Sequence, residues 1–335
     1  MSSSGTQLTA FVSGGNRGIG LQVCKDIVAH AASGGLSAWL GLGCRNLEQG
    51  KALAAELSSG SGGKVAVEAI ELDVLSAESI RAAAASVEAR VAAEGLTVLV
   101  NNAGIMLEAQ HPIYTAAAAE KTWAVNFEGV VAVTDAFLPL LLRSTSAAAP
   151  GDVPPADPHM SSLSSTRTST TSPTAPIILS TSSGVGARTL GLVSEEHRAA
   201  LLAEDLDEEA LRRLVQELLR EVNEDEAHPY RSSIPSLGYG VSKMAVNCYT
   251  MMLARRWPAE RLRVNACSPG FTNTDMCRHY TGSRVPKDVP LGASVAAKVI
   301  FGALGEGRTG TFFKEASKAG TSLEDATSVV DPWVQ

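Results

Sequence analysis

Cysteine is scarce in this chain and follows none of the spacings that metal sites or disulfide frameworks need. The 335 residues contain five cysteines, an odd number, with no CxxC pair and no accompanying histidine pattern. They are Cys24, Cys44, Cys248, Cys267 and Cys277. The pattern predicts buried, reduced thiols, and it favours neither a disulfide framework nor a zinc site. We therefore expect no metal.

Signals for membrane insertion and secretion are also missing. No uninterrupted apolar run reaches the roughly 18 residues that suggest a membrane span. Met1–Thr9 lacks the basic start and apolar core of a secretory signal. The formal net charge of −7 argues against general affinity for nucleic acid or anionic membrane. These absences predict a cytoplasmic protein that binds neither membrane nor nucleic acid.

Apolar, β-rich runs alternate with longer helical patterns along most of the chain. The expected strands are Leu8–Ser13, Ser37–Gly43, Val65–Leu72, Thr97–Val100, Ile177–Ser180, Arg263–Ala266 and Thr311–Lys314. The expected helices are Gly20–Ala31, Leu47–Ser58, Ser76–Ala93, Thr115–Leu142, Tyr239–Trp257 and Gly292–Leu304. This alternation predicts an α/β fold with a doubly wound, Rossmann-type parallel sheet, helices on both faces, and a single domain over residues 1–335.

Two segments interrupt the alternation. Of the 33 residues in 144–176, 26 are Ser, Thr, Pro, Ala or Gly, which predicts a low-complexity, disordered insertion within the domain. The second segment, 190–234, is expected to be a helical insertion before the helix that carries Tyr239.

The negative charge is concentrated in this second segment. Residues 194–228 hold 12 acidic and 4 basic residues, a net of −8, so the rest of the chain carries about +1. An apolar helical stripe runs through it at Leu211, Leu214, Val215, Leu218, Leu219 and Val222. The stripe predicts a surface helix lying on the core or, alternatively, a lid or oligomer-blocking flap beside the active site.

A glycine-rich loop joins the first expected strand to the first expected helix. Its sequence is Ser13-Gly14-Gly15-Asn16-Arg17-Gly18-Ile19-Gly20. Gly14 permits the tight turn, Gly18 lets the backbone approach a pyrophosphate, and Gly20 lets helix and sheet pack closely. The helix N-terminus then offers amide donors to phosphates. The loop predicts a dinucleotide site.

The end of the second expected strand distinguishes between the two nicotinamide dinucleotides. Folds that bind NAD usually place an acidic residue there for the ribose 2′-hydroxyl. Here the run is Leu42-Gly43-Cys44-Arg45-Asn46. Arg45, together with Arg17 in the loop, could hold a 2′-phosphate by charge-assisted hydrogen bonds. The predicted cofactor is NADP.

Tyr239 and Lys243 stand four residues apart in Tyr239-Gly240-Val241-Ser242-Lys243. On a helix this spacing places both side chains on one face. A phenol with a pKa near 10 is a poor acid–base group at neutral pH, and a nearby ammonium, reinforced by an oxidised nicotinamide, would lower that pKa. The pair predicts acid–base chemistry.

Six motifs, in order, resemble those of the short-chain dehydrogenase/reductase family over nearly the whole chain. They are Ser13–Gly20, Asn101-Asn102-Ala103-Gly104, Asn126 in Val-Asn-Phe-Glu-Gly, Ser182-Ser183, Tyr239 with Lys243, and Ser268-Pro269-Gly270. Within the family the chain is most similar to monomeric carbonyl reductases and related plant ketone reductases. Arg188 five residues after Ser183, the insertion before Tyr239, and Thr274-Asp275-Met276 carry that likeness. The resemblance implies a monomer.

The resemblance also implies catalytic roles. Tyr239 would give a proton to the carbonyl oxygen, and Lys243 would lower the pKa of Tyr239 and bind the nicotinamide ribose. Ser183, with Ser182 as the neighbouring alternative, would donate a hydrogen bond to the substrate oxygen. Asn126 would hold a backbone kink and a water that links Lys243 to solvent.

Further cofactor contacts follow from the same resemblance. Asp73, followed by Val74, would contact adenine, and Asn102, with Ala103 and Gly104, would line the adenosine portion. Beyond Pro269 and Gly270, three residues would hold the carboxamide and a nearby phosphate: Thr272, Asn273 and Thr274. A purely structural role remains open for two of these positions, because Asp73 could cap a turn and Asn102, with Asn101, could brace a strand end.

The sequence therefore predicts NADPH-dependent reduction of a small carbonyl compound, and we weigh three hypotheses for the protein's role. The first is a broad reductase of ketones, aldehydes or quinones. The second is a dedicated biosynthetic ketone reductase or alcohol dehydrogenase of narrow specificity. A third hypothesis, a non-catalytic NADP-binding sensor, is disfavoured because Asn126, Ser183, Tyr239 and Lys243 are all present.

Overall fold

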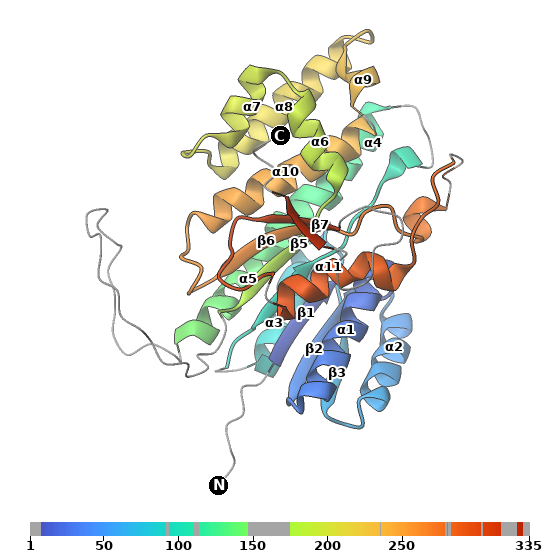
Figure 1. Ribbon diagram of the computed structural model, residues 1–335, viewed down its shortest axis with the longest axis vertical. Coiled ribbons are helices and arrows are strands. Elements are labelled where there is room, and N and C mark those ends of the chain that lie inside the picture. The colour runs from blue at the N-terminus through green and yellow to red at the C-terminus, as the bar shows by residue number, and fades with distance from the viewer. Residues whose placement is uncertain are drawn as a thin grey trace, which may run out of the picture.

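A single mixed sheet organises the described part of the chain (Figure 1). Its strands are β1 (Leu8–Ser13), β2 (Ala38–Cys44), β3 (Val65–Glu71), β4 (Val98–Asn101), β5 (Ile177–Thr181), β6 (Arg263–Ser268), β7 (Phe312–Glu315) and β8 (Thr327–Val330). They are ordered β3-β2-β1-β4-β5-β6-β7-β8. The first seven run parallel and β8 pairs antiparallel with β7. The predicted doubly wound parallel sheet is confirmed, with β8 as an unpredicted addition.

The computed structural model describes residues 8–91, 94–109, 114–146, 175–234, 236–278, 280, 283–302, 304–315 and 327–330. Most of the predicted insertion 144–176 lies outside these residues. Its two attachment points are described: the chain leaves at the end of α5 (Gly129–Ser146) and returns at the start of β5. The return point is at the amino end of the parallel strands, opposite the edge where their carboxyl ends meet.

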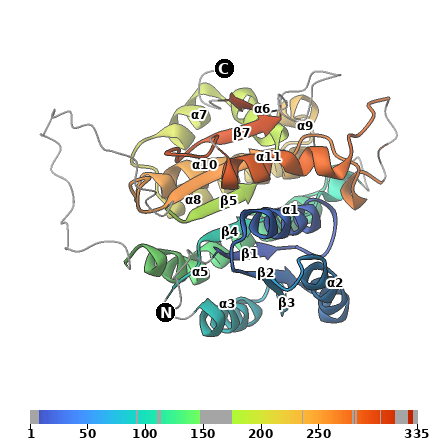
Figure 2. The ribbon, with the colours of Figure 1, turned by 60° about the horizontal axis from the view of Figure 1, so that its bottom comes forward.

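Two helical layers cover the sheet (Figures 1 and 2). One face carries α1 (Gly18–Gly34), α2 (Leu47–Gly60) and α11 (Val289–Phe301). The other carries α3 (Ala77–Val91), α4 (Ala116–Trp123), α5 and α10 (Leu237–Ala254). Every residue of β2 and β6 is buried, as expected for central strands covered on both faces.

The acidic segment folds into short helices and one long one. These are α7 (Glu195–Leu202), α8 (Glu208–Glu224) and α9 (Tyr230–Ser233), and α6 (Gly184–Leu192) precedes them. The Asp207 side chain caps α8 by accepting from the Ala210 amide at 2.7 Å. Leu211, Val215, Leu218 and Val222 are buried in the same core cluster as α10. The apolar face of α8 therefore packs on the core, as the surface-helix interpretation predicts.

The long helix expected over Thr115–Leu142 contains an interruption. Between α4 and α5 lies a π-turn, η2 (Ala124–Glu128), in which the Gly129 amide donates to the Ala124 carbonyl five residues earlier. The stretch Ala116–Ser144 is long and apolar enough to cross a membrane, but 61% of its apolar window is buried inside the protein. This burial is typical of a core helix.

Candidate functional site

The glycine-rich loop forms a close-fitting cradle between β1 and α1. Gly14 has a φ of +66°, a left-handed conformation that favours glycine. A Cβ added to Gly20 would lie 2.2 Å from the Gly14 carbonyl oxygen, so no larger residue fits there. The loop can therefore bring its backbone against a bulky anion such as a pyrophosphate, which fits the predicted dinucleotide.

The segment after β4 is fastened to this cradle. Ser13 Oγ accepts hydrogen bonds from the amides of Asn102 (2.9 Å) and Ala103 (3.1 Å). Asn102 Nδ2 donates in turn to the carbonyls of Ser13 and Gly14 at 3.1 and 3.2 Å. Asn101 Nδ2 donates to Thr134 Oγ1 at 2.8 Å. Both asparagines thus brace the strand end, and a contact of Asn102 with the adenosine remains a prediction.

The residues expected around the 2′-phosphate lie on the exposed side of the cradle. Arg45 follows β2 and is exposed. Asn16 Nδ2 donates to Gln49 Oε1 at 2.9 Å, which ties the loop to α2. Arg17 Nη1 forms an ion pair with Asp275 Oδ2 at 3.0 Å. Arg17 therefore extends to the segment after β6, and its convergence with Arg45 on one phosphate stays a prediction.

Asp73 forms the turn that precedes α3. Its Oδ1 accepts from the Leu75 amide at 3.0 Å, and its own amide donates to Ser79 Oγ at 2.9 Å. Val74 packs against the start of α5, since a Cβ added to Gly129 would lie 2.9 Å from Val74. The turn-capping alternative for Asp73 is thus observed, and its contact with adenine is untested.

Asn126 lies at the centre of the π-turn and is fully buried. Its Oδ1 accepts from the Ile105 amide at 2.8 Å, and its Nδ2 donates to the Ile105 carbonyl at 2.9 Å and to Ser242 Oγ at 3.0 Å. One side chain thus joins the segment after β4 to α10. The backbone irregularity expected at Asn126 is present, since π-turns of this kind interrupt α-helices and are frequent at functional sites.

Tyr239 and Lys243 occupy one face of α10 and are both buried. Lys243 Nζ lies 5.9 Å from the centre of the Tyr239 ring and donates to the Thr181 carbonyl at 2.7 Å. A Cβ added to Gly104 would lie 3.5 Å from Lys243 Nζ and 3.2 Å from Asn126 Oδ1. The ends of β4 and β5 and the helix α10 therefore meet at one point.

The two candidate serines differ in orientation. Ser182 is buried, and its Oγ donates to the Lys243 carbonyl at 3.2 Å. Ser183 begins α6, accepts from the Val185 amide at 3.2 Å, and hydrogen-bonds the Tyr239 side chain. The position of Ser183 beside the phenol favours it over Ser182 as the substrate-polarising group.

Burial is the main cause of the shifted pKa values of Tyr239 and Lys243. It raises the pKa of Tyr239 to about 12, against the lowering effect of the Ser183 hydrogen bond. Burial also lowers the pKa of Lys243 to about 8. The lowering expected from Lys243 together with an oxidised nicotinamide remains a prediction, and burial of the phenol acts in the opposite direction because desolvation disfavours the phenolate. Tyr239 is therefore protonated at neutral pH, as a proton donor must be.

The segment after β6 closes the other side of the site. Thr272 is buried, and its Oγ1 donates to the Pro269 carbonyl at 3.1 Å, while the Asn273 amide donates to the Lys287 carbonyl at 2.8 Å. A Cβ added to Gly18 would lie 3.3 Å from Thr274 Cγ2. Thr274 thus faces the glycine cradle, whereas the Thr272 side chain mainly holds the turn around Gly270.

Glu108 is a buried site residue that the sequence analysis missed. It lies just after the Asn101–Gly104 motif, in η1 (Leu107–Ala109), and its side chain is 6% exposed. Its Oε1 accepts from the Tyr239 amide at 3.1 Å, within the first turn of α10. A carboxylate is stabilised at that end of a helix by unpaired amides and the helix dipole. With 131 positions separating the two residues, no sequence spacing links them.

Two family models match the chain on either side of the segment that carries Ser183. The model described as short chain dehydrogenase matches residues 8–149, and one described as enoyl-(acyl carrier protein) reductase matches residues 232–302. The first spans the glycine cradle and Asn126, and the second spans α10. The chain belongs to the short-chain dehydrogenase family.

Individual members of the family resemble the chain over most of its length. It is 28% identical to carbonyl reductase (NADPH) 3 from Rattus norvegicus over 287 residues, covering 83% of this chain and 86% of that protein. It is also 28% identical to salutaridine reductase from Papaver bracteatum over 318 residues, covering 84% and 88%.

Solved structures of short-chain dehydrogenases share the fold. Salutaridine reductase from Papaver somniferum superposes with a TM-score of 0.65 at 23% identity, covering 91% of this chain and 99% of that one. Menthone neomenthol reductase from Mentha piperita gives a TM-score of 0.64 at 22% identity, covering 92% and 99%. At these identities the likeness supports the architecture alone.

Proposed function

We propose that this protein reduces the carbonyl group of a small ketone, aldehyde or quinone with NADPH, and that Tyr239 donates the proton. The chain is an NADP-dependent oxidoreductase of the short-chain family, and its curated relatives include NADPH carbonyl reductases. The observation that carries the proposal is the meeting of Ser183, Tyr239 and Lys243 beside the glycine cradle.

The cradle suits NADP. The turn at Gly14 and Gly20 would hold the pyrophosphate, with Asn16, Gly18 and Ile19 at the start of α1. Arg45 and Arg17 would contact the 2′-phosphate. Asp73, Val74 and Ala103 would lie along the adenosine, and Asn273 and Thr274 would lie near the nicotinamide. When bound, NADPH supplies the hydride that adds to the carbonyl carbon.

The side chains of the protein would stabilise and then neutralise the negative charge that develops on the carbonyl oxygen of the substrate. As the carbon–oxygen π bond opens, negative charge develops on the carbonyl oxygen, and the Ser183 hydroxyl would stabilise it by a hydrogen bond. Tyr239 would then transfer its phenolic proton to that oxygen to form the alcohol. Lys243 would stabilise the transient phenolate, and Asn126 would hold the path by which a solvent proton returns to it.

Replacing Ser183 with Ala should lower kcat by roughly 10²- to 10³-fold, the effect of losing one donor to a developing oxyanion. The matched control is Ser182→Ala, which removes the neighbouring hydroxyl that donates to the Lys243 carbonyl. Steady-state kinetics with NADPH and one carbonyl substrate would compare the two. A larger loss with Ser182→Ala would reverse the assignment of the serines.

Arg45→Ser should raise the KM for NADPH by roughly 10- to 100-fold, because hydrogen bonds to a charged group contribute about 1.5–3 kcal/mol. The KM for NADH, which lacks the 2′-phosphate, should not change. Lys51→Ser is the control, since Lys51 lies on neighbouring α2 and pairs with Glu48. An equal effect on both cofactors would remove Arg45 from the phosphate site.

A panel of quinones, aldehydes and ketones, assayed with NADPH and NADH side by side, tests the proposal directly. Consumption of NADPH on several substrates supports the broad reductase. Tight NADPH binding without turnover would favour a dedicated biosynthetic reductase or alcohol dehydrogenase of narrow specificity. A preference for NADH would contradict the NADP assignment.

We further propose that the enzyme works as a cytoplasmic monomer.

A further inference from the structure

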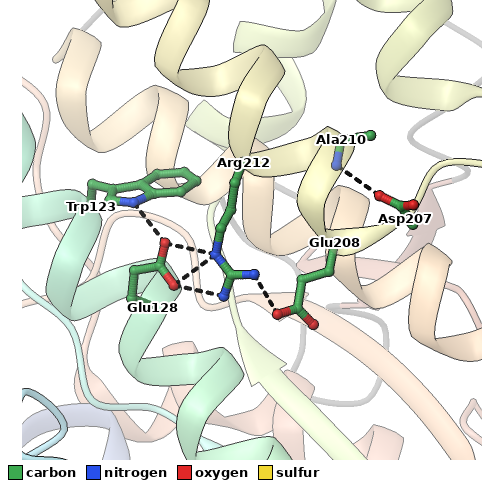
Figure 3. A network of polar contacts seen from close by, with 6 residues as sticks. All are labelled: Trp123, Glu128, Asp207, Glu208, Ala210 and Arg212. Atoms are coloured by element: carbon green, nitrogen blue, oxygen red, sulfur yellow. Dashed lines mark hydrogen bonds and ion pairs between the residues drawn. The ribbon is translucent and has the colours of Figure 1, made fainter.

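A polar brace spans the outer side of the π-turn that carries Asn126 (Figure 3). Trp123, just before η2, donates from Nε1 to Glu128 Oε1 at 3.1 Å, and Glu128 is the last residue of the turn. The two side chains are five residues apart, the same interval as the backbone hydrogen bond of the turn. They therefore link its beginning to its end.

Arg212 of α8 binds the Glu128 carboxylate of this pair. Its Nε lies 3.1 Å from both Glu128 carboxylate oxygens, and its Nη2 lies 2.8 Å from Oε2. Nη1 donates to Glu208 Oε1 at 2.5 Å, one helical turn earlier on α8. Hydrogen bonding to Glu128 is the main cause that raises the pKa of Arg212 above its usual value. Forked arginine–carboxylate contacts of this kind fix orientation as well as charge.

The brace is shielded more than an ordinary surface ion pair. The Arg212 and Glu128 side chains are 31% and 35% exposed, whereas those of Arg220 and Glu224, on the same helix, are 62% and 64% exposed. The Trp123 ring stacks on Phe127 inside the turn, with ring centres 4.2 Å apart, and the Arg212 guanidinium lies 5.9 Å from the Phe127 ring. Shielding reduces screening by solvent and raises the contribution of the pair.

A π-turn needs such support. Its five-residue hydrogen bond departs from the regular α-helical pattern, so the turn persists where surrounding contacts compensate. On the inner side, Asn126 bonds to Ile105 and Ser242. On the outer side, the brace from α8 restrains the same five residues.

We propose that Arg212 and Glu128 are positioning residues that hold Asn126, and through it Ile105 and Ser242, in register with Tyr239 and Lys243. The acidic helix α8 thereby supports the catalytic geometry from 84 residues away in sequence. This inference rests on the proposed function, since it assigns to the brace the maintenance of the proton path through Asn126.

Arg212→Met and Glu128→Gln should each lower kcat by about tenfold and leave the KM for NADPH unchanged. In a profile of kcat against pH, the loss should be largest where the return of a solvent proton to Tyr239 limits turnover. Arg212→Lys should retain an intermediate kcat. Hydrogen exchange at the Ile105 amide, which donates to Asn126, should become faster in Arg212→Met. Arg220→Met, which removes an exposed arginine paired with Glu224 on the same helix, should change none of these.

The deciding comparison adds Arg212→Met to an Asn126→Ala background. If the brace acts through Asn126, kcat should fall no further in the double variant. Additive losses of kcat would overturn this inference and leave the proposed function standing. So would a fall in thermal stability with unchanged kcat and unchanged hydrogen exchange at Ile105. Full turnover by Asn126→Ala would overturn both the inference and the role proposed for Asn126. If the wild-type protein reduces no carbonyl, the proposed function fails, and the Ile105 exchange rate still decides whether Arg212 holds the turn.

Discussion

Tyr239→Phe should lower kcat for carbonyl reduction by roughly 10²- to 10⁴-fold, the usual contribution of a positioned proton donor. The phenyl ring keeps the shape of the buried side chain, so the change removes only the hydroxyl. Because the pKa of Tyr239 is raised to about 12, the lost group is a protonated phenol throughout the neutral range. The dissociation constant for NADPH, measured by cofactor fluorescence, should change little.

A matched control exists on the same helix. Tyr249 is also a buried tyrosine of α10, ten positions after Tyr239. Tyr249→Phe should preserve kcat, whereas a comparable loss in both variants would indicate damage to the helix and not loss of a donor. The same pair separates an enzyme from a sensor, since a sensor that only binds NADP would keep its function in Tyr239→Phe.

The fold and the centre of the site were predictable because each rests on local chemistry. Parallel strands covered on both faces need near-continuous apolar runs, so β1, β2 and β4 could be recognised directly. The glycine cradle depends on residues within one turn, and the Tyr239–Lys243 spacing places two groups on one helical face. The start of α3 is likewise local, since Ser76 Oγ accepts from the Ser79 amide at 3.2 Å.

What escaped prediction depends on contacts between distant segments. Glu108 bonds the Tyr239 amide across 131 positions, and Arg212 bonds Glu128 across 84. No local pattern marks either charge as a partner of a distant segment. The pairing of Arg17 with Asp275, 258 positions later, is of the same kind.

The burial of Tyr239 and Lys243 was hidden from the sequence for a related reason. The spacing to Lys243 identifies a favourable charge, but it does not reveal how completely both groups are withdrawn from water. The tyrosine is 7% exposed and the lysine 3% exposed. Desolvation at that depth opposes the charged form of each, and it outweighs the Ser183 hydrogen bond.

Lys243→Met should lower kcat by about 10²-fold or more. The free energy of unfolding should not fall comparably. Burial lowers the lysine pKa from 10.5 to about 8, so the folded protein binds that proton less tightly than the unfolded chain. Below pH 8 both states are protonated, and the folded state bears the full cost, about 3 kcal/mol for a shift of this size. Methionine removes this cost but leaves the Thr181 carbonyl without its lysine donor, at about 1–3 kcal/mol.

The two terms nearly cancel at pH 7, where the free energies of unfolding of variant and wild type should agree within about 2 kcal/mol. Between pH 8 and 10.5 the unfolded wild type binds more protons than the folded state, so wild-type stability should rise relative to the variant by about 3 kcal/mol. Urea unfolding at pH 7 and pH 10 measures this difference. Lys25→Met, which replaces an exposed lysine on α1, should follow the wild type at both pH values. Parallel behaviour of Lys243→Met and wild type would mean that the ammonium is solvated and that its pKa is not lowered by burial beside Tyr239.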